Sequence, residues 1–448
     1  MIRWFYSCLM WLAQPLLKRK LLRRSQQEPG YAQHLPERFG HYDQAVPAHA
    51  GPTVWLHAVS LGETRAAAVL IAALRAQWPQ MRLLLTHGTA TGRAEGLKLL
   101  AAGDLQAWQP WDTPGAVQRF LSHFRPQIGI LMETEVWPNL IWACQQQAIP
   151  LTLVNARLSD KSLQQAQRLA WLARPAFAAL TAVWAQTQAD AQRLQSLGAR
   201  VVGVMGNLKF DATPNPAQVA QGRAWRLQGK QAVMLLASSR EGEEQALLDI
   251  LKRFWPLAQN QQAQKAIDSV ANKVQWLIVP RHPQRFDAVA ALMASEGFVV
   301  QRRSTWSAAG PSQVAGQPTI WLGDSLGEMA LYYGLADVAL LGGSFEPLGG
   351  QNLIEAAACG CPVVMGPHTF NFAQAAEQAL VAGAAQRAVN LAQAVDLACE
   401  LPLSNSRWQE ARESALRFAQ SHQGAAQRLA EALRQFLVEF PTENRVSS

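Results

Sequence analysis

The stretch TVWLHAVSLGETRAAAVLIAALRAQ, residues 53–77, begins with a short apolar run at 54–57 and passes into a helical pattern over 64–77. The same succession of an apolar run and a helical pattern repeats to about residue 205. Further strands of this half are predicted at 82–86, 127–132, 151–154, 182–185 and 201–205. Strands that alternate with helices of about 10 to 15 residues predict a parallel, doubly wound α/β sheet.

The rhythm breaks at 209–230, where Pro214, Asn215 and Pro216 indicate a linker. It then restarts, with strands predicted at 232–237, 275–279, 298–301, 319–322, 337–341 and 362–365. We therefore expect two Rossmann-like domains, at 31–208 and 231–448, the second ending in helices and carrying exposed loops at 259–273 and 304–318. Because ligands of such sheets bind at the carboxyl ends of the strands, we expect the two sheets to face each other across one cleft.

Residues 1–30 carry six basic side chains and one acidic one beside an apolar run over 4–17. An apolar run followed by Lys18-Arg19-Lys20 is typical of a membrane anchor whose basic end faces anionic lipid. The run contains Arg3 and Pro15 and is marginal for a spanning helix, which needs about 20 apolar residues. A helix in the membrane interface fits as well. A cleaved signal peptide fits poorly, since the basic cluster follows the apolar run and no small-residue cleavage site is present.

The rest of the chain is close to neutral. The 448 residues contain 40 Lys and Arg against 32 Asp and Glu, and residues 1–30 hold five of the eight excess positive charges. The remaining body has no basic face that would indicate a nucleic-acid partner. Five Cys without a C-x-x-C pair indicate neither a disulfide framework nor a cysteine metal cage, and they favour a reducing compartment.

Carboxylates follow two of the predicted strands in the first half. Glu63 lies in the loop after the first strand, where a general base for a hydroxyl nucleophile would be placed. The spacing Ser60-x-x-Glu63 is also a capping box, in which Glu63 only bonds back to the start of a helix. Glu133 and Glu135 follow another strand, and they either orient a substrate hydroxyl or stabilise a helix N-terminus through its dipole. From the residues alone, both interpretations stay open for each loop.

A glycine-rich loop, LGGSFEPLGGQNLIE at 341–355, follows a strand in the second half. Glycines allow close approach of the backbone to a phosphate, and a helix that starts near Asn352 would direct free amides at the anion. Glu355 is placed to accept hydrogen bonds from ribose hydroxyls. The loop is neither G-x-G-x-x-G nor a Walker A motif, so it gives only weak support for a dinucleotide or a nucleoside triphosphate as the ligand. The competing interpretation is a simple turn, with Asn352 and Glu355 as helix caps.

Basic side chains follow two of the strands predicted in the second half. Ser239-Arg240 and Arg281-His282 each follow a predicted strand and suit a phosphate or a sugar carboxylate. Lys209 falls at the domain junction, where it would reach a ligand when the cleft closes. The sequence contains no D-x-D, no H-E-x-x-H and no His cluster at ligand spacing. A metal mechanism is therefore not indicated, and leaving-group charge is left to amides and cations.

Together these stretches resemble the 3-deoxy-D-manno-octulosonic acid (Kdo) transferases of lipopolysaccharide biosynthesis. The matching segments are 57–63, 132–139, 155–159, 206–211, 237–244, 280–283, 323–326, 342–355 and 365–372, in the family's order. The resemblance implies a GT-B glycosyltransferase fold. It also implies transfer of Kdo, with inversion, from CMP-Kdo to a lipid A precursor (lipid IVA) at the cytoplasmic face of the inner membrane, without a metal or another cofactor.

The resemblance also assigns roles. The family's proposed base maps onto Glu63 and its acidic motif onto Glu133 and Glu135, so these three are the expected catalytic residues. The phosphate of CMP is expected near Gly342 and Gly343, the helix that begins near Asn352, and Arg281. The whole expected donor site comprises Lys209, Ser239, Arg240, Arg281, His282, Gly342, Gly343, Ser344, Gly349, Gly350, Gln351, Asn352 and Glu355.

Two positions depart from the family's pattern. Many relatives carry His where this chain has Gln351, and Thr-His where it has Ser239-Arg240. Because Gln351 cannot titrate near neutral pH, a proton-transfer role is not expected at that position. Arg240 adds a permanent charge that suits an anionic donor.

Two alternatives of different kinds remain. One is another GT-B enzyme, such as a UDP-sugar transferase or a non-hydrolysing sugar-nucleotide epimerase. The other is a membrane-bound protein that binds a nucleotide sugar and has lost catalysis. The presence of Glu63 and of the full glycine-rich loop favours an active Kdo transferase.

Overall fold

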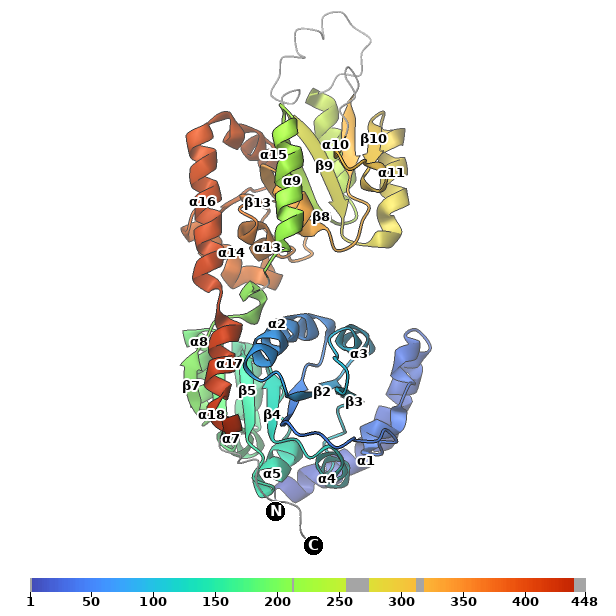
Figure 1. Cartoon of the computed structure of the whole chain (residues 1–448), viewed down its shortest axis with the longest axis vertical. Coiled ribbons are helices and arrows are strands. Elements are labelled where there is room, and N and C mark those ends of the chain that lie inside the picture. Colours follow the sequence, from blue (N-terminus) through green and yellow to red (C-terminus); the bar gives the residue numbers. More distant parts are fainter. Residues whose placement is uncertain (1, 212, 255–273, 312–317, 439–448) are drawn as a thin grey trace, which may run out of the picture. The chain divides into compact units, whose positions relative to one another are not determined.

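The structure, a computed structural model, describes residues 2–211, 213–254, 274–311 and 318–438. It divides into two compact units (Figure 1): unit 1 comprises residues 1–212 and 422–448, and unit 2 comprises residues 213–421. Each unit contains one parallel sheet of seven strands, which confirms the expected α/β class. The predicted loop at 259–273 lies outside the described residues, as do 312–317 of the loop predicted at 304–318.

The sheet of unit 1 has the strand order β3-β2-β1-β4-β5-β6-β7. Its strands are β1 (Thr53–His57), β2 (Arg82–His87), β3 (Leu105–Trp108), β4 (Ile128–Met132), β5 (Leu151–Ala156), β6 (Ala182–Ala185) and β7 (Val201–Val204). Residues of β1, β2, β4 and β5 are buried on both faces, as expected for a parallel sheet covered by helices. The sequence missed β3, because its four residues include Gln106 and form no extended apolar run.

Helices cover both faces of this sheet. The helices of unit 1 are α1 (Ile2–Ser25), α2 (Leu61–Gln77), α3 (Ala90–Leu97), α4 (Pro114–Phe124), α5 (Pro138–Gln146), α6 (Asp160–Arg168), α7 (Ala170–Ala178), α8 (Gln188–Ser196), α17 (Ala425–Leu433) and α18 (Gln435–Val438). Trp55 packs in one apolar cluster with residues of α4, α5, α7 and α8. Its neighbours Val54 and Leu56 pack in a second cluster with residues of α2 and α17.

The last helices lie in unit 1, whereas the sequence placed them in a domain running to residue 448. Leu429 and Leu433 of α17 are buried in the cluster that contains Leu70 and Leu74 of α2, beside which α17 lies (Figure 1). The Asp211 carboxylate accepts hydrogen bonds from the amides at the start of α17. An amphipathic pattern predicts a helix but does not say which core its apolar stripe completes.

The sheet of unit 2 has the strand order β10-β11-β9-β8-β12-β13-β14. Its strands are β8 (Ala232–Ser239), β9 (Val274–Pro280), β10 (Val299–Arg302), β11 (Thr319–Leu322), β12 (Val338–Leu341), β13 (Val363–Met365) and β14 (Ala385–Arg387). Its helices are α9 (Pro216–Gln228), α10 (Glu243–Phe254), α11 (Phe286–Ser295), α12 (Met329–Leu335), α13 (Leu353–Ala358), α14 (Ala373–Val381), α15 (Leu391–Glu400) and α16 (Asn405–His422). The edge strand β14 was not expected from its sequence, Ala-Gln-Arg.

The expected linker at 209–230 is largely helix α9, and unit 2 begins at residue 213 instead of 231. The Asn215 side chain accepts hydrogen bonds from two amides of the first turn, so the Asn and Pro residues that indicated a linker start a helix. A Cβ atom on Gly222 would lie only 2.2 Å from the carbonyl oxygen of Leu331. The absence of a side chain at Gly222 therefore lets α9 pack closely on α12.

Helix α1, Ile2–Ser25, is fastened to the rest of unit 1 by hydrogen bonds from two of its polar side chains. The Tyr6 hydroxyl donates to Asp112 at 3.0 Å, and the Ser7 hydroxyl donates to Asn139 at 2.9 Å. The exposed apolar side chains of α1 are Trp4, Phe5, Leu9, Trp11, Leu12, Leu16 and Leu22. None of the helices within the described ranges combines the length and the apolar character that a membrane crossing requires.

Candidate functional site

The predicted site residues gather at the carboxyl ends of the strands in each unit. In unit 1 the neighbouring strands β1 and β4 are followed by Glu63, in the first turn of α2, and by Glu133 and Glu135, in the loop before α5; we call these three residues the acidic cluster. In unit 2 the loops after β8, β9 and β12 carry most of the residues expected to bind the donor. These are the sheet edges at which open α/β sheets bind ligands.

Glu63 forms the capping box that its spacing predicted. Its two carboxylate oxygens accept hydrogen bonds from the Val59 amide and the Ser60 hydroxyl, both at 2.9 Å, and its own amide donates to Ser60 Oγ at 3.4 Å. Burial raises the pKa of Glu63, these hydrogen bonds oppose the rise, and the nearby charge of Glu133 adds to it. These hydrogen bonds orient the carboxylate, which as an ionised group can still accept a proton.

Glu133 faces two cations. Its Oε2 lies 3.6 Å from Nε of Arg157, and its Oε1 lies 3.8 Å from Nζ of Lys209. Its backbone has a φ of 57°, a left-handed conformation that is strained for a residue with a side chain. Such strain persists where surrounding contacts hold it, here through the Glu133 amide bonded to the Val154 carbonyl at 3.1 Å.

Lys209, which the sequence assigned to the donor site, lies in unit 1 with the acidic cluster. The segment before it is held by Asn155, whose Oδ1 accepts from the Leu208 amide at 3.0 Å. The Lys209 amide itself donates to Asn207 Oδ1 at 3.0 Å. Within unit 1, the Lys209 side chain lies 3.8 Å from the Glu133 carboxylate, and its predicted role in donor binding stays a prediction.

Glu135 is the carboxylate of the cluster with the largest change in acidity. Its Oε2 accepts from the indole nitrogen of Trp137 at 2.8 Å and lies 3.9 Å from Nε2 of His57. Burial, reinforced by the charges of Glu63 and Glu133, raises the pKa of Glu135 to about 7. Near neutral pH this carboxyl therefore exchanges a proton readily.

His57 is fully buried beneath Glu135, and burial lowers its pKa to about 3, so its ring is neutral. Its Nδ1 lies 3.1 Å from the Thr86 carbonyl oxygen, which only accepts hydrogen bonds. We therefore assign the proton to Nδ1, which leaves the lone pair of Nε2 on the side of Glu135. A neutral ring offers no charge to hold Glu135 ionised, which agrees with the raised pKa of that carboxyl.

In unit 2 the first amides of the glycine-rich loop are used inside the fold. The Gly342 amide donates to the Ala237 carbonyl at 2.9 Å, and the Gly343 amide donates to the Glu243 carboxylate at 2.8 Å. The Phe345 amide donates to the same carboxylate at 3.3 Å. A buried carboxylate and a carbonyl therefore already bind the amides of Gly342 and Gly343, and the prediction that the phosphate lies near these glycines, the start of α13 and Arg281 depends on other donors.

The second glycine pair offers different donors. Gly349 and Gly350 have φ angles of 88° and 72°, a left-handed turn that glycine adopts without strain. Asn371 supports this turn by donating from Nδ2 to the Leu348 carbonyl at 3.0 Å. Within the described part of the chain, the amides of Gly349, Gln351 and Asn352 donate no hydrogen bond. These amides are the ones that the loop presents to an anion.

Three expected donor-binding side chains shape the loops. Ser239 donates to Glu244 at 2.6 Å, and Ser344 donates to the Leu341 carbonyl at 2.5 Å. Both serines are fully buried, so their hydroxyls are used within unit 2. Asn352 caps α13 by accepting from the Ile354 amide at 3.1 Å, which is the simple capping role that the sequence left open.

The remaining expected residues are accessible. Arg281 is exposed and forms no ion pair with any residue that the structure describes, and His282 is half-buried beside it. Arg240 and Gln351 flank Gly343: a Cβ atom on that glycine would lie 3.6 Å from Arg240 Cγ and 3.2 Å from Gln351 Nε2. Glu355 is half-buried in the first turn of α13. The structure thus brings two cations and the second glycine pair to one edge of unit 2.

Known proteins are similar in sequence to this chain over nearly its whole length. The family model for 3-deoxy-D-manno-octulosonic-acid transferases matches residues 33–212, which include the whole acidic cluster. A 3-deoxy-D-manno-octulosonic acid transferase of Bordetella pertussis is 44% identical over 94% of this chain and 96% of its own length. The chain belongs to the Kdo transferases. A further Kdo transferase, from Haemophilus influenzae, is 31% identical over 98% of this chain and 99% of that protein.

A solved structure supports the fold of this Kdo transferase. A glycosyltransferase from Rickettsia africae has a TM-score of 0.52 at 14% identity and covers 87% of this chain and 99% of its own. At that identity the likeness concerns the fold alone. With the two parallel seven-stranded sheets, it confirms the expected GT-B class.

Two charged groups of this Kdo transferase were missed by the sequence reasoning. Glu243 is 1% exposed and binds the glycine-rich loop, while Arg285 donates to both oxygens of the buried Glu244 at 2.8 and 3.0 Å. The spacing Arg240-x-x-Glu243 resembles Ser60-x-x-Glu63 in the corresponding loop of unit 1, and that likeness was an available signal. No group of three His, Cys, Asp or Glu suited to a metal ion occurs among the residues searched, those that the structure describes.

Proposed function

We propose that this Kdo transferase moves Kdo from CMP-Kdo to a lipid A precursor, lipid IVA, at the cytoplasmic face of the inner membrane, without a metal or another cofactor. Glu63 accepts the proton of an acceptor sugar hydroxyl, which attacks the anomeric carbon of Kdo with inversion. The bond from that carbon to the CMP phosphate breaks, and CMP leaves with the bonding electron pair.

The observation that carries this proposal is the acidic cluster. A general base works best when its pKa lies near the operating pH, and burial moves the pKa of Glu63 in that direction. The capping box holds the carboxylate in one orientation, which favours proton transfer in a defined geometry. Glu135, with a pKa of about 7, is suited to receive the proton from Glu63 after transfer.

Unit 2 provides groups that match an anionic donor. CMP-Kdo carries a phosphate and a sugar carboxylate, and departure of CMP leaves charge on the phosphate that cations and amides stabilise. Arg240, Arg281 and the free amides of Gly349, Gln351 and Asn352 are the groups of unit 2 suited to this task. Arg281 is assigned to the phosphate, because a guanidinium binds phosphate oxygens through paired hydrogen bonds.

Helix α1 supports the proposed location. Its polar side chains bond to Asp112 and Asn139, so its exposed Trp, Phe and Leu side chains are free to enter a lipid surface. Aromatic residues followed by Lys18, Arg19 and Lys20 suit an interfacial helix that lies on an anionic leaflet.

The direct test is mass spectrometry of the product formed from CMP-Kdo and defined lipid IVA in the presence of EDTA. The expected product carries added Kdo, and EDTA leaves the rate unchanged. Absence of Kdo transfer would refute the activity, and strong inhibition by EDTA would refute its metal independence. Calorimetric titration with CMP and with UDP adds a specificity test, in which CMP is expected to bind more tightly.

A further inference from the structure

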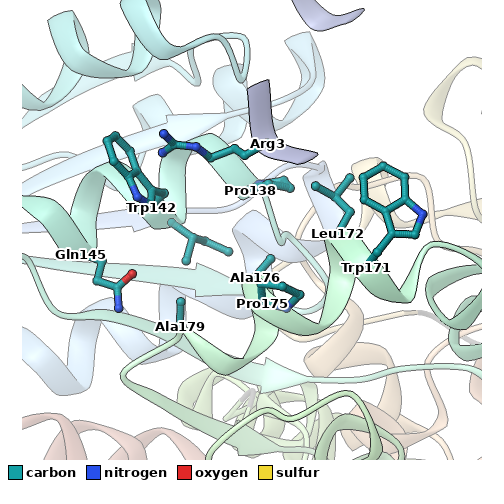
Figure 2. A pocket seen from close by; sticks show the side chains of 10 residues that line it. Arg3, Pro138, Trp142, Gln145, Trp171, Leu172, Pro175, Ala176 and Ala179 are labelled. Carbon is teal, nitrogen blue, oxygen red and sulfur yellow. The ribbon is translucent and has the colours of Figure 1, made fainter. Parts of the chain in front are cut away.

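An apolar cavity of about 490 Å³ opens on unit 1 beside the first turn of α1. Its walls come from α5 and α7, with Trp142, Trp171 and Leu172 among them (Figure 2). The guanidinium carbon of Arg3 lies 3.3 Å from the centre of a Trp142 ring and covers it (Figure 2). One end of the cavity therefore lies at the first turn of α1, the helix with the exposed apolar side chains.

A second cavity, of about 430 Å³, adjoins the first. The two share the lining residues Pro138, Leu172 and Ala176. The second cavity extends to Thr134 and Trp137, which flank Glu133 and Glu135 in the sequence and belong to the acidic loop. The two cavities thus follow one another from α1 to the loop that carries Glu133 and Glu135, and we call them together the apolar trough.

The chemistry of the trough is uniform. Among the described residues that line it, Arg3 is the only charged one, and most of the others are aliphatic or aromatic. Trp142 is 42% exposed and Trp171 is 44% exposed, so large apolar side chains face solvent along its rim. Contiguous exposed apolar surface of this kind marks a binding site for an apolar ligand or partner.

We propose that the trough binds one fatty acyl chain of the acceptor lipid and so places the acceptor sugar at the acidic cluster. Its course supports this occupant, since it leads from Arg3 and Tyr6 of α1 to the loop that carries Glu133 and Glu135. Its composition supports it too, because mostly aliphatic and aromatic walls suit an apolar chain. A free sugar would find few hydrogen-bond partners on these walls.

This inference rests on the proposed function, because it names the part of the acceptor that unit 1 recognises. The acceptor would be selected by its acyl chain as well as by its sugar. Each methylene that enters the trough should then tighten acceptor binding about fourfold, the usual gain for burying one such group.

The test uses Leu172→Gln, because Leu172 lines both cavities and Gln keeps a similar size while adding a polar amide. The KM for acylated lipid IVA is compared with the KM for the same acceptor after chemical removal of its acyl chains. In wild type the acylated acceptor should have the lower KM. Leu172→Gln should reduce that preference about tenfold, while the KM for CMP-Kdo stays within twofold.

Leu97→Gln is the matched control, because Leu97 is an exposed leucine of the same unit that lines neither cavity. It should leave the preference for the acylated acceptor unchanged. Trp142→Ala, at a partly exposed position of the rim, provides a second variant if Leu172→Gln does not fold. It should also reduce the preference.

Three outcomes would overturn the assignment. An unchanged preference in both trough variants would show that the acyl chain binds elsewhere. Weaker binding to phospholipid vesicles with an unchanged acceptor preference would show that the trough holds bulk membrane lipid instead. Wild type that transfers Kdo to neither acceptor would refute the proposed function itself, which separates that failure from the failure of the trough.

Discussion

Glu63 in unit 1 and Glu243 in unit 2 occupy corresponding places, each in the first turn of the helix that follows the first strand of its unit. Each carboxylate accepts a hydrogen bond at 2.9 Å from a backbone amide a few residues earlier, Val59 and Arg240 respectively. Beyond that bond they differ. Glu63 is only partly buried and bonds locally, whereas Glu243 is 1% exposed and also binds two amides of the glycine-rich loop a hundred residues away.

The comparison separates a chemical glutamate from a structural one. The same position after a parallel strand can have a chemical or a structural role. Which role it has depends on whether a loop distant in the sequence binds the carboxylate. Where Gly343 and Phe345 use the oxygens, the carboxylate holds a loop in place; where no distant loop does so, it keeps lone pairs for a substrate. The predictions below test whether this division holds.

The largest expected effect is on catalysis, from Glu63→Gln. The amide oxygen and nitrogen of Gln can keep hydrogen bonds within the cap but cannot accept the proton, so kcat for Kdo transfer should fall about 10² to 10⁴-fold. CMP binding, measured by calorimetry, should stay within twofold. Glu95→Gln, at a glutamate paired with Arg65 and Lys98, serves as the control and should retain activity. A near-normal rate for Glu63→Gln would remove Glu63 from the role of base.

The matching substitution in unit 2, Glu243→Ala, should act on stability. It leaves the amides of Arg240, Gly343 and Phe345 without their buried acceptor, which should lower the free energy of unfolding of unit 2 by about 3 kcal/mol. Urea unfolding measures the change. Glu241→Ala, at an exposed neighbour, should lower the free energy of unfolding much less, because solvent screens its ion pairs. Equal effects of the two substitutions would contradict a structural role for Glu243.

The third prediction concerns pH and Glu135. Because its pKa is raised to about 7 in the folded protein, the folded state holds a proton that the unfolded state has released above its ordinary pKa near 4.5. Stability from this group is therefore complete below pH 4.5 and is lost as the pH rises through 7. From pH 4.5 to pH 7, the free energy of unfolding of Glu135→Gln should rise relative to that of wild type by roughly 2 to 3 kcal/mol. Above pH 7 the difference should stay constant. A difference that stays constant from pH 4.5 to pH 7 would refute the raised pKa.

The smallest expected effect comes from Lys209→Met, which tests the placement of Lys209 with Glu133. Loss of one of the two cations beside Glu133 should lower kcat/KM for the acceptor about tenfold, the range of one hydrogen bond to a charged group. CMP affinity should change less than twofold. Lys161→Met, at an exposed lysine of α6, is the control. A loss of CMP affinity with unchanged acceptor kinetics would instead make Lys209 a donor-binding residue.

Much of the fold followed from local patterns. Long apolar runs such as Ile128–Met132 predicted the central strands, whereas the short edge strands β3 and β14 contain polar residues and gave no such signal. The division into units was misplaced at both ends, at α9 and at α17. Their amphipathic stripes require a partner surface, and a stripe does not identify that surface.

The candidate site shows the same division. The sequence alone determined the alternation of strands and helices, the capping box at Ser60 and Glu63, and the two glycine pairs, because a few neighbouring residues specify each of them. Only the tertiary structure decided that Glu243 takes the Gly343 amide, that Lys209 faces Glu133, and that a neutral His57 lies under Glu135. The reason is physical: hydrogen bonds between distant loops, and the loss of water around a buried carboxyl, depend on groups far apart in the chain that only the folded state brings together.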